Sequence, residues 1–405
     1  MKILYIVHRI PYPPNKGDKI RSFNEIKYLS INHEIHLCCL VDNPEDLQYG
    51  NALKAYCKTV KIIPINPTLA KLKTIIYFFS NIPLSVPYFY TRKLQKAVNH
   101  LLATIPFDCI FCLSSAMAEY VFRAYSYESA IRVMDFVDVD SDKWVQYSEY
   151  EKWPLSWIHR MEGKRLAEYE KKIAVRFDHS IFVSKSELAI FTSYCPHVKN
   201  ATVIPNGVDF EYFSPSPALS VTTDNGQLAK DKRYPLLLFT GAMDYYPNVE
   251  GVIWFCSEIL PCIFAEYPDV MFYIVGSNPH PKVLSLQKGN GIRVTGFVED
   301  IRLYYHSADV CVIPLRLARG VQNKVLEAMA MGKPVVTTSK GIQGFKAIPE
   351  HHLLVGDTPG KFALNVINLL KNERRRTELG QSSRNWVKNN YQWSKNMGML
   401  ERLIK

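Results

Sequence analysis

Residues 307–339 read SADVCVIPLRLARGVQNKVLEAMAMGKPVVTTS, and this stretch contains a strand, a loop, a helix and the start of a second strand. The run DVCVIPL is short and apolar, which is typical of a strand buried on both faces of a parallel sheet. A helix is expected over roughly Gln322 to Met331, where Gly332 supplies the C-terminal cap and Pro334 opens the next strand. The stretch therefore predicts an α/β fold.

The same alternation of apolar strands and helix-period segments extends along the whole chain. Strands separated by helices indicate parallel sheets that are covered on both faces. In the first half the expected strands are KILYIV, EIHLCCLV, VKIIPI, DCIFCL, IRVMDF, HSIFVS and TVIPN, and in the second half LLLFTG, MFYIVG, IRVTG, DVCVIPL, PVVTTS and HLLVG.

A polar stretch rich in turn formers, SPSPALSVTTDNGQLAKDKR, separates the two halves. With 405 residues, two doubly wound domains are expected, and ligands of such folds bind at the carboxyl ends of the strands. We expect a first domain over residues 1–205, a linker over 206–233, a second domain over 234–385, and a C-terminal helical segment over 386–405 that packs back on the first domain.

Composition narrows the function classes. The net charge of +11 suggests an anionic partner, but no nucleic-acid-binding module is recognisable, so no nucleic acid is expected. No G-x-G-x-x-G follows any strand, which disfavours a dehydrogenase. No signal peptide or membrane span is apparent, and the nine cysteines have irregular spacing, so reduced thiols in the cytoplasm are expected. Cys109 and Cys112 have redox or zinc spacing, but they lie inside one strand without a second pair.

Polar residues concentrate at the start of the helix in residues 307–339. Lys324 and Glu327 are three residues apart and share a helix face, with Asn323 beside them. A helix N-terminus with a lysine in its first turn is a site for a diphosphate, and a carboxylate one turn deeper can accept hydrogen bonds from ribose hydroxyls. The alternative is a capped helix with a solvated charge pair, which the apolar character of the helix disfavours.

This segment resembles the family 4 glycosyltransferases, which have the GT-B fold of two Rossmann-like domains facing each other across a cleft. Their signature is a pair of glutamates separated by seven residues, the second in an LEAMA-like helix followed by G-x-PVV. Glu327 matches the second glutamate, and the resemblance implies that it contacts the nucleotide ribose. Arg319 stands where the first glutamate would be, and it would hold phosphate oxygens or an acidic sugar.

Other segments extend the resemblance along the second half. LFTGAMDYYPNVEGVIWF is similar to the first strand and loop of the nucleotide domain, with Gly241 at the strand end. Its loop lacks the arginine and lysine that many members place on the diphosphate, so Arg316, Arg319 and Lys324 are the expected cations. The loop in VTGFVED implies that Phe297 and Val298 lie beside the base.

In the first half, HRIPYPPNKGDKIRS is similar to the family's glycine-containing loop, which implies that Gly17 and Arg21 lie near the donor phosphates. The alternative is an ordinary strand–helix turn. In VMDFVDVDSDKW, Asp138 or Asp140 occupies the region where members often have a histidine that faces the reacting sugar. These aspartates are interpreted as catalytic, and the alternatives are a divalent metal site or a plain acidic loop.

The segments GDKIRS, DFVDVDSDKW, PNGVD and ARGVQNKVLEAMA together resemble the bacterial sugar transferases of PEP-CTERM/exosortase-type exopolysaccharide clusters. The resemblance implies a retaining, metal-independent hexosyltransferase without a cofactor. Its substrates would be a nucleotide-diphosphate sugar and a glycan or lipid-linked acceptor in exopolysaccharide biosynthesis. The alternatives are a GT-B sugar-nucleotide epimerase and a non-catalytic sugar-nucleotide-binding protein.

A last feature is the stretch from Leu47 to Phe107, which contains eight lysines and arginines and no Asp or Glu. Within it, residues 67–96 set aromatic and apolar residues between cations. We expect this segment to bind an anionic membrane surface at the inner face of the plasma membrane. The cations are Lys71, Lys73, Arg92 and Lys93, and the alternative is that Ile75, Ile76, Phe78 and Phe79 pack in the domain core.

Overall fold

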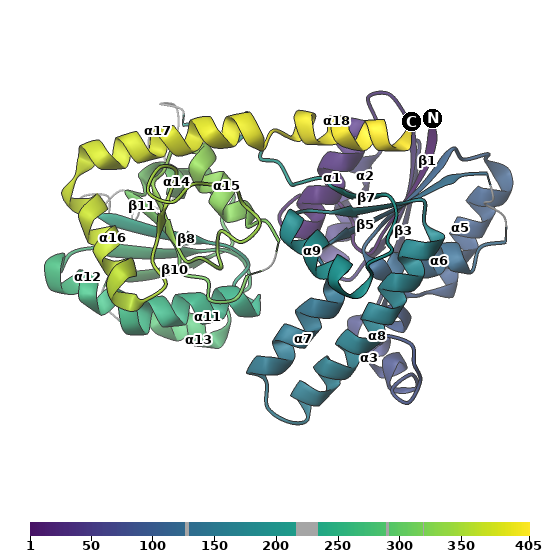
Figure 1. The fold of residues 1–405 in the computed structure, drawn as a ribbon, viewed down its shortest axis with the longest axis horizontal. Coiled ribbons are helices and arrows are strands. Elements are labelled where there is room, and N and C mark those ends of the chain that lie inside the picture. Colours follow the sequence, from purple (N-terminus) through teal and green to yellow (C-terminus); the bar gives the residue numbers. More distant parts are fainter. Residues whose placement is uncertain (126–128, 216–233, 289–290, 319) are drawn as a thin grey trace. The chain divides into compact units, whose positions relative to one another are not determined.

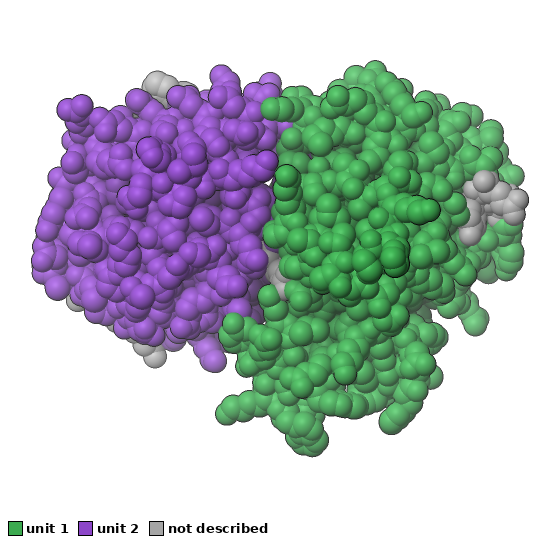
Figure 2. Space-filling model, viewed as in Figure 1, with its two compact units in different colours: residues 1–205, 394–405 green, residues 206–393 purple. Residues whose placement is uncertain are grey.

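The structure is a computed structural model that describes residues 1–125, 129–215, 234–288, 291–318 and 320–405. The chain forms two compact units, which Figure 2 distinguishes by colour. Unit 1 comprises Met1–Pro205 and Ser394–Lys405, and unit 2 comprises Asn206–Trp393. The expected division assigned residues 386–393 to the returning C-terminal segment, whereas the structure keeps them in unit 2, because helix α17 (Glu373–Asn390) packs against α15 and α16 of that unit.

Unit 1 is built on a seven-stranded sheet in which all neighbouring strands are parallel, in the order β3-β2-β1-β4-β5-β6-β7. The central strands β1 and β4 are almost entirely buried, as their uninterrupted apolar sequences predict. All seven strands expected in this half are confirmed: β1 (Lys2–Val7), β2 (Glu34–Val41), β3 (Thr59–Pro64), β4 (Cys109–Leu113), β5 (Ile131–Val137), β6 (His179–Phe182) and β7 (Ala201–Val203).

Helices connect these strands, and two of them, α7 and α8, form a hairpin that extends away from the sheet (Figure 1). The C-terminal helix α18 (Trp393–Ile404) belongs to unit 1 from Ser394 onward, where its Glu401 carboxylate lies within hydrogen-bond distance of the Asn32 side chain. The helices of this unit are α1 (Gly17–Leu29), α2 (Gly50–Leu53), α3 (Pro67–Ile75), α4 (Ser85–Phe89), α5 (Arg92–Thr104), α6 (Ala118–Phe122), α7 (Asp140–Tyr150), α8 (Leu155–Arg176) and α9 (Lys185–Tyr194).

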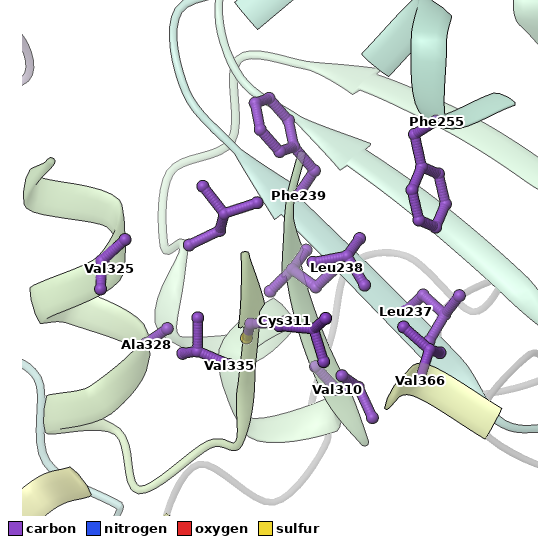
Figure 3. Close-up of a cluster of buried hydrophobic side chains, with 14 of the residues drawn as sticks. Leu237, Leu238, Phe239, Phe255, Val310, Cys311, Val325, Ala328, Val335 and Val366 are labelled. Carbon is purple, nitrogen blue, oxygen red and sulfur yellow. The ribbon is translucent and has the colours of Figure 1, made fainter. Parts of the chain in front are cut away.

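Unit 2 contains a six-stranded parallel sheet in the order β10-β9-β8-β11-β12-β13, and the six expected strands are again present. Figure 3 shows its core, where Phe239 of β8, Val335 of β12 and Val325 of α15 point into one apolar cluster. The strands are β8 (Leu236–Thr240), β9 (Met271–Val275), β10 (Ile292–Gly296), β11 (Val310–Ile313), β12 (Val335–Thr337) and β13 (Leu354–Val355), and the other helices are α11 (Tyr246–Trp254), α12 (Leu260–Glu266), α13 (Pro281–Leu284), α14 (Arg302–Ser307), α15 (Asn323–Ala330) and α16 (Pro359–Lys371).

Helices α11 and α12 are continuous through a π-helical turn, and together they span Tyr246–Glu266. Contrary to the expectation from sequence, this helix is long and apolar enough by length and composition to cross a membrane. Half of its most apolar window is buried inside unit 2, where the Phe255 ring lies 4.6 Å from that of Phe272 and 5.8 Å from that of Phe362. Its apolar residues therefore contribute to the core of unit 2.

The cysteine pair in β4 has no joint function in this fold. Cys109 and Cys112 are both buried and carry free thiols. Residues three apart on a strand point to opposite faces of the sheet, so the two sulfur atoms do not share a site. Burial raises the pKa of Cys109 to about 12, which keeps its thiol protonated and unreactive.

Candidate active site

A polar cluster lies at the carboxyl end of β8, beside the first turn of α15. Gly241 directly follows β8, and a Cβ placed on it would lie 2.9 Å from Lys324 Nζ and 2.7 Å from Asn248 Nδ2. The Lys324 ammonium donates a hydrogen bond to Asn248 Oδ1 and lies 4.2 Å from the centre of the Phe239 ring. The structure thus brings together Gly241 and Lys324, which the sequence singled out, and adds Asn248 in the first turn of α11.

Backbone geometry explains why glycine occupies this strand end. Gly241 has a φ of +149° and Gly276, which follows β9, has a φ of +157°. A Cβ on Gly276 would lie 1.7 Å from the carbonyl oxygen of Gly241, so the two loops approach each other more closely than any side chain allows. Glycine at both positions is therefore required for the two loops to pack against each other.

Glu327 lies one turn further along α15, and its carboxylate is held by a tyrosine that the sequence analysis did not identify. The Tyr305 hydroxyl lies 3.0 Å from Glu327 Oε2 and 2.8 Å from Thr240 Oγ1. Since the carboxylate can only accept when ionised, Tyr305 donates to Glu327 and fixes its orientation. Burial raises the pKa of Glu327, although the bond from Tyr305 and the charge of Lys324 act in the opposite direction.

Lys324 is a buried lysine whose surroundings disfavour its charged form in the absence of a ligand. Burial lowers the pKa of its ammonium to about 7, against the opposing effect of Glu327. A charged ligand oxygen near Nζ would reverse this shift because an opposite charge favours the protonated form. The positive end of the α15 dipole adds to the attraction for anions.

The other site residues that the sequence predicted in unit 2 lie at separate positions. Asn323 accepts a hydrogen bond from Asn206 at 3.2 Å, which attaches the PNGVD segment to the start of α15. Phe297 follows β10 and is 70% exposed, whereas Val298 packs against the core. Arg319 lies outside the described residues.

Arg316 lies beside a different set of side chains. Its guanidinium is paired with Glu250 and lies over the Trp254 ring at 5.1 Å. These residues line a groove of about 490 Å³ that also contains His280 and Lys282 but neither Lys324 nor Glu327. The structure therefore places Arg316 on this groove, paired with a carboxylate, and not in the Lys324–Glu327 cluster.

In unit 1, the two aspartates follow the end of β5, as expected. Val137 has a φ of +63°, a strained conformation for a β-branched residue, and the buried Asp135 stabilises it by accepting the Val137 N–H at 2.8 Å. The chain thereby turns so that Asp140 begins α7, where it is ion-paired with Lys143. Among the described residues no group of three or more His, Cys, Asp and Glu side chains is arranged to hold a metal ion, and Asp138 has an interaction partner of its own.

The expectation that Arg21 lies near the donor phosphates is wrong. Its side chain is fully buried, with Nε 2.6 Å from Asp135 Oδ2 and 3.1 Å from Glu25 Oε1, so it neutralises buried carboxylates in unit 1 and is not exposed to a donor. Gly17 is exposed at the first position of α1. The neighbouring Asp18 accepts from Arg9 and lies 3.0 Å from His8 Nε2. Burial alone would raise the pKa of Asp18, but these two partners lower it.

Comparison with known proteins places this cluster in a family. Residues 234–372 match the family model described as Glycosyl transferases group 1, and this range contains Gly241, Asn248, Tyr305, Lys324 and Glu327. Residues 234–372 form a glycosyl transferase group 1 domain. The cluster at the end of β8 is therefore part of a domain whose family transfers sugars.

Several known proteins are similar to this chain over nearly its entire length. An uncharacterised 44.6 kDa protein in the cps region of Klebsiella pneumoniae is 22% identical over 404 residues, which cover 96% of each chain. Sucrose-phosphate synthase from Thermosynechococcus elongatus superposes with a TM-score of 0.73 at 18% identity, covering 100% of this chain and 98% of that one. The Anabaena protein HepE in complex with UDP-glucose gives a TM-score of 0.68 at 17% identity, covering 99% and 98%. The fold is thus GT-B.

Proposed function

We propose that this glycosyltransferase moves a hexosyl group, with retention of configuration, from a nucleotide-diphosphate sugar to a glycan or lipid-linked acceptor. The observation that carries the proposal is the cluster of Lys324, Glu327 and Asn248 at the end of β8, inside the group 1 domain. The similarity to HepE, which was solved with UDP-glucose, supports a nucleotide-sugar donor.

Different residues of this region would bind different parts of the donor. Lys324 and the N-terminus of α15 would bind the diphosphate beside Gly241, where a Cβ would lie only 2.9 Å from Lys324 Nζ. Glu327, oriented by Tyr305, would accept hydrogen bonds from the ribose hydroxyls. The exposed ring of Phe297 and the neighbouring Val298 would contact the base.

We further propose that no metal ion takes part in the reaction. The developing charge on the leaving diphosphate would be stabilised by fixed positive charge, which Lys324 and the α15 terminus supply and to which Arg319 would add. Asp138 or Asp140 would face the reacting sugar or the acceptor hydroxyl. Expected results are full activity in a chelator, and lower turnover with nearly unchanged donor affinity in Asp138→Asn or Asp140→Asn. Loss of activity in the chelator that magnesium restores would contradict the metal-free proposal.

The biological role that we propose is exopolysaccharide biosynthesis in the cytoplasm. The relative in the cps region of Klebsiella pneumoniae, which aligns with nearly the entire chain, supports a role in polysaccharide assembly. A substrate panel separates this proposal from its alternatives: nucleoside diphosphate released only with an acceptor indicates a transferase, isomerised donor indicates an epimerase, and binding without turnover indicates a binding protein.

The decisive measurement is calorimetric binding of nucleoside diphosphate to Glu327→Ala and Lys324→Ala. A buried charge-assisted hydrogen bond contributes about 1.5–3 kcal/mol, so each variant should bind at least about tenfold more weakly. Lys340→Ala and Glu373→Ala, at exposed positions of the same unit, are the matched controls and should bind like the wild type. Unchanged affinity in both site variants would show that the cluster is not the donor site.

A further inference from the structure

Helix α3 in unit 1 has its apolar residues on the outside. None of its nine residues is buried. Its three large apolar side chains are well exposed: Leu69 is 63% exposed, Leu72 56% and Ile75 63%. The turn that follows continues the pattern, with Ile76 81% and Phe79 95% exposed. Leu69, Leu72 and Ile76 have the i, i+3, i+7 spacing of one helix face, so the face that would normally pack on a core is turned to solvent. The core packing considered for Ile75, Ile76 and Phe79 is therefore wrong.

A second exposed apolar element lies against this turn. At the junction of α7 and α8, Trp153 is 81% and Trp157 is 52% exposed. The Trp157 ring is 5.6 Å from that of Phe78, and Arg165 of α8 donates to the Phe78 carbonyl oxygen at 2.8 Å. Both elements lie at the same end of unit 1 (Figure 1). We define the apolar tip as Leu69, Leu72, Ile76, Phe79, Trp153 and Trp157.

The turn is held rigidly on α8, so its exposure is built into the fold. The Glu162 carboxylate accepts the backbone N–H groups of Leu84 at 2.6 Å and Ser85 at 3.0 Å. Two side chains of α8 therefore bind the two ends of the 77–85 segment. Arg165 binds its start at Phe78, and Glu162 binds its end at Leu84 and Ser85. Single exposed apolar residues are common on protein surfaces, whereas a contiguous group of this kind marks an interaction site.

Charge identifies the partner. Lys71 within α3 and Lys152 beside Trp153 are exposed cations of this region, Lys93 at the start of α5 is exposed as well, and the sequence from Leu47 to Phe107 contains no acid. Lys73 does not contribute fully, because its ammonium donates to the Tyr90 carbonyl oxygen at 2.7 Å. The exposed acids of this region are Glu149 and Glu151 in the α7–α8 hairpin. Apolar and indole side chains surrounded mainly by lysines fit an anionic bilayer, where tryptophan prefers the headgroup level.

We propose that the apolar tip inserts into the headgroup region of an anionic lipid bilayer and attaches the enzyme to it peripherally. This inference goes beyond the transfer reaction and rests on unit 1 alone. Insertion removes the exposed apolar side chains from water, and the surrounding lysines and arginines are attracted to lipid phosphates. Neither apolar insertion nor electrostatic attraction alone holds a protein on a membrane, but the two together give reversible attachment.

The test is co-sedimentation of the full-length protein, without donor, with phosphatidylcholine vesicles that contain or lack phosphatidylglycerol. We expect binding to the anionic vesicles that falls steeply as salt is raised. Ile76→Ser/Phe79→Ser should weaken it at least about tenfold, and Lys71→Gln/Lys93→Gln about fivefold for each cation removed. Val175→Ser, at an exposed position on the far end of α8, and Lys340→Gln in unit 2 are matched controls that should bind like the wild type.

Denaturant unfolding of the same variants, followed by hydrogen exchange in β1 and β4, checks that unit 1 is folded, and calorimetric nucleoside diphosphate binding by unit 2 separates this inference from the proposed function. Lys324→Ala should lose nucleotide affinity and keep vesicle binding, whereas Ile76→Ser/Phe79→Ser should do the reverse. Equal recovery with neutral and anionic vesicles, or none at low salt, would overturn the inference. Self-association in the absence of lipid that the Ile76→Ser/Phe79→Ser change abolishes, without vesicle binding, would instead identify the apolar tip as an interface between copies of the chain.

Discussion

Lys324 makes donor binding dependent on pH. Burial lowers the pKa of its ammonium to about 7 in the unliganded protein, so below pH 7 the residue is charged and above it increasingly neutral. A bound diphosphate raises that pKa again, and binding above pH 7 is therefore accompanied by proton uptake. Nucleoside diphosphate affinity should fall by up to about tenfold per pH unit between pH 7 and 9.

Calorimetry in two buffers of different ionisation enthalpy measures the proton taken up on binding. Lys324→Met provides the control, because it retains the length of the side chain without a titrating group and should show a flat profile between pH 7 and 9. The same slope in the wild type and in Lys324→Met would assign the proton to another group.

Arg21 is the cation that keeps two carboxylates buried in unit 1. Removing it leaves Asp135 and Glu25 without their shared partner in a fully buried setting. Breaking a buried ion pair by removing one partner costs about 3–5 kcal/mol, so Arg21→Met should lower the free energy of unfolding by that order in denaturant titrations. Arg9→Met, whose side chain is partly exposed, should cost less. A loss below about 1 kcal/mol for Arg21→Met would show that the carboxylates are protonated or otherwise compensated.

The sequence indicated some residues of the site and not others, for physical reasons. Lys324 and Glu327 share one turn of α15, so their juxtaposition follows from helix geometry alone. Asn248 and Tyr305 reach the same point from α11 and α14, and only the parallel order of β8 and its neighbours brings them there. For Arg21 a local signal existed, since Glu25 is four residues on, but Asp135 lies 114 residues away.

At the scale of elements, the strands were predictable because each is a short apolar run buried on both faces, and all thirteen are found. Helix α3 was not, because Ile75 and Ile76 have the periodicity of a core helix, and only the tertiary structure shows that none of the described residues buries this face. Apolar periodicity predicts that a helix has an apolar face, but not what that face contacts.

The contact between the β8 and β9 loops provides a test at this scale. A side chain at Gly276 would collide with the Gly241 backbone and also occupy a strained φ. Gly276→Ala should therefore displace the loop, weaken nucleoside diphosphate binding at least about tenfold and destabilise unit 2 by about 1–3 kcal/mol. Gly360→Ala is the matched control, because a Cβ there meets nothing within 4 Å and the residue lies in α16 of the same unit. Equal behaviour of the two variants in binding and melting would show that the loops are not constrained.

At the scale of the whole molecule, unit 1 is built from two segments that are far apart in the sequence. Unit 1 is completed by residues from the far end of the sequence, after the chain has passed through all of unit 2. The residues from 394 onward that pack on unit 1 include Met397, Leu400 and Ile404, all fully buried. Tyr28 lies beside them, with its hydroxyl 3.5 Å from a Glu401 carboxylate oxygen and 3.5 Å from the position of a Cβ on Gly398.

A chain ending at Trp393 should consequently have a less stable unit 1, although most of unit 1 lies at the other end of the sequence. The truncation exposes the apolar surface of unit 1 that α18 covers, and burial of each large apolar side chain contributes about 1.5–3 kcal/mol, so unit 1 should unfold at lower denaturant concentration. Unit 2 retains Gly241, Asn248, Tyr305, Lys324 and Glu327, and nucleoside diphosphate binding should persist while sugar transfer is lost. Hydrogen exchange that becomes faster in α1 and β1 but not in β8 and α15 would demonstrate this division. If exchange accelerated instead in unit 2, or if the truncated chain were as stable as the full one, α18 would not be part of the unit 1 core.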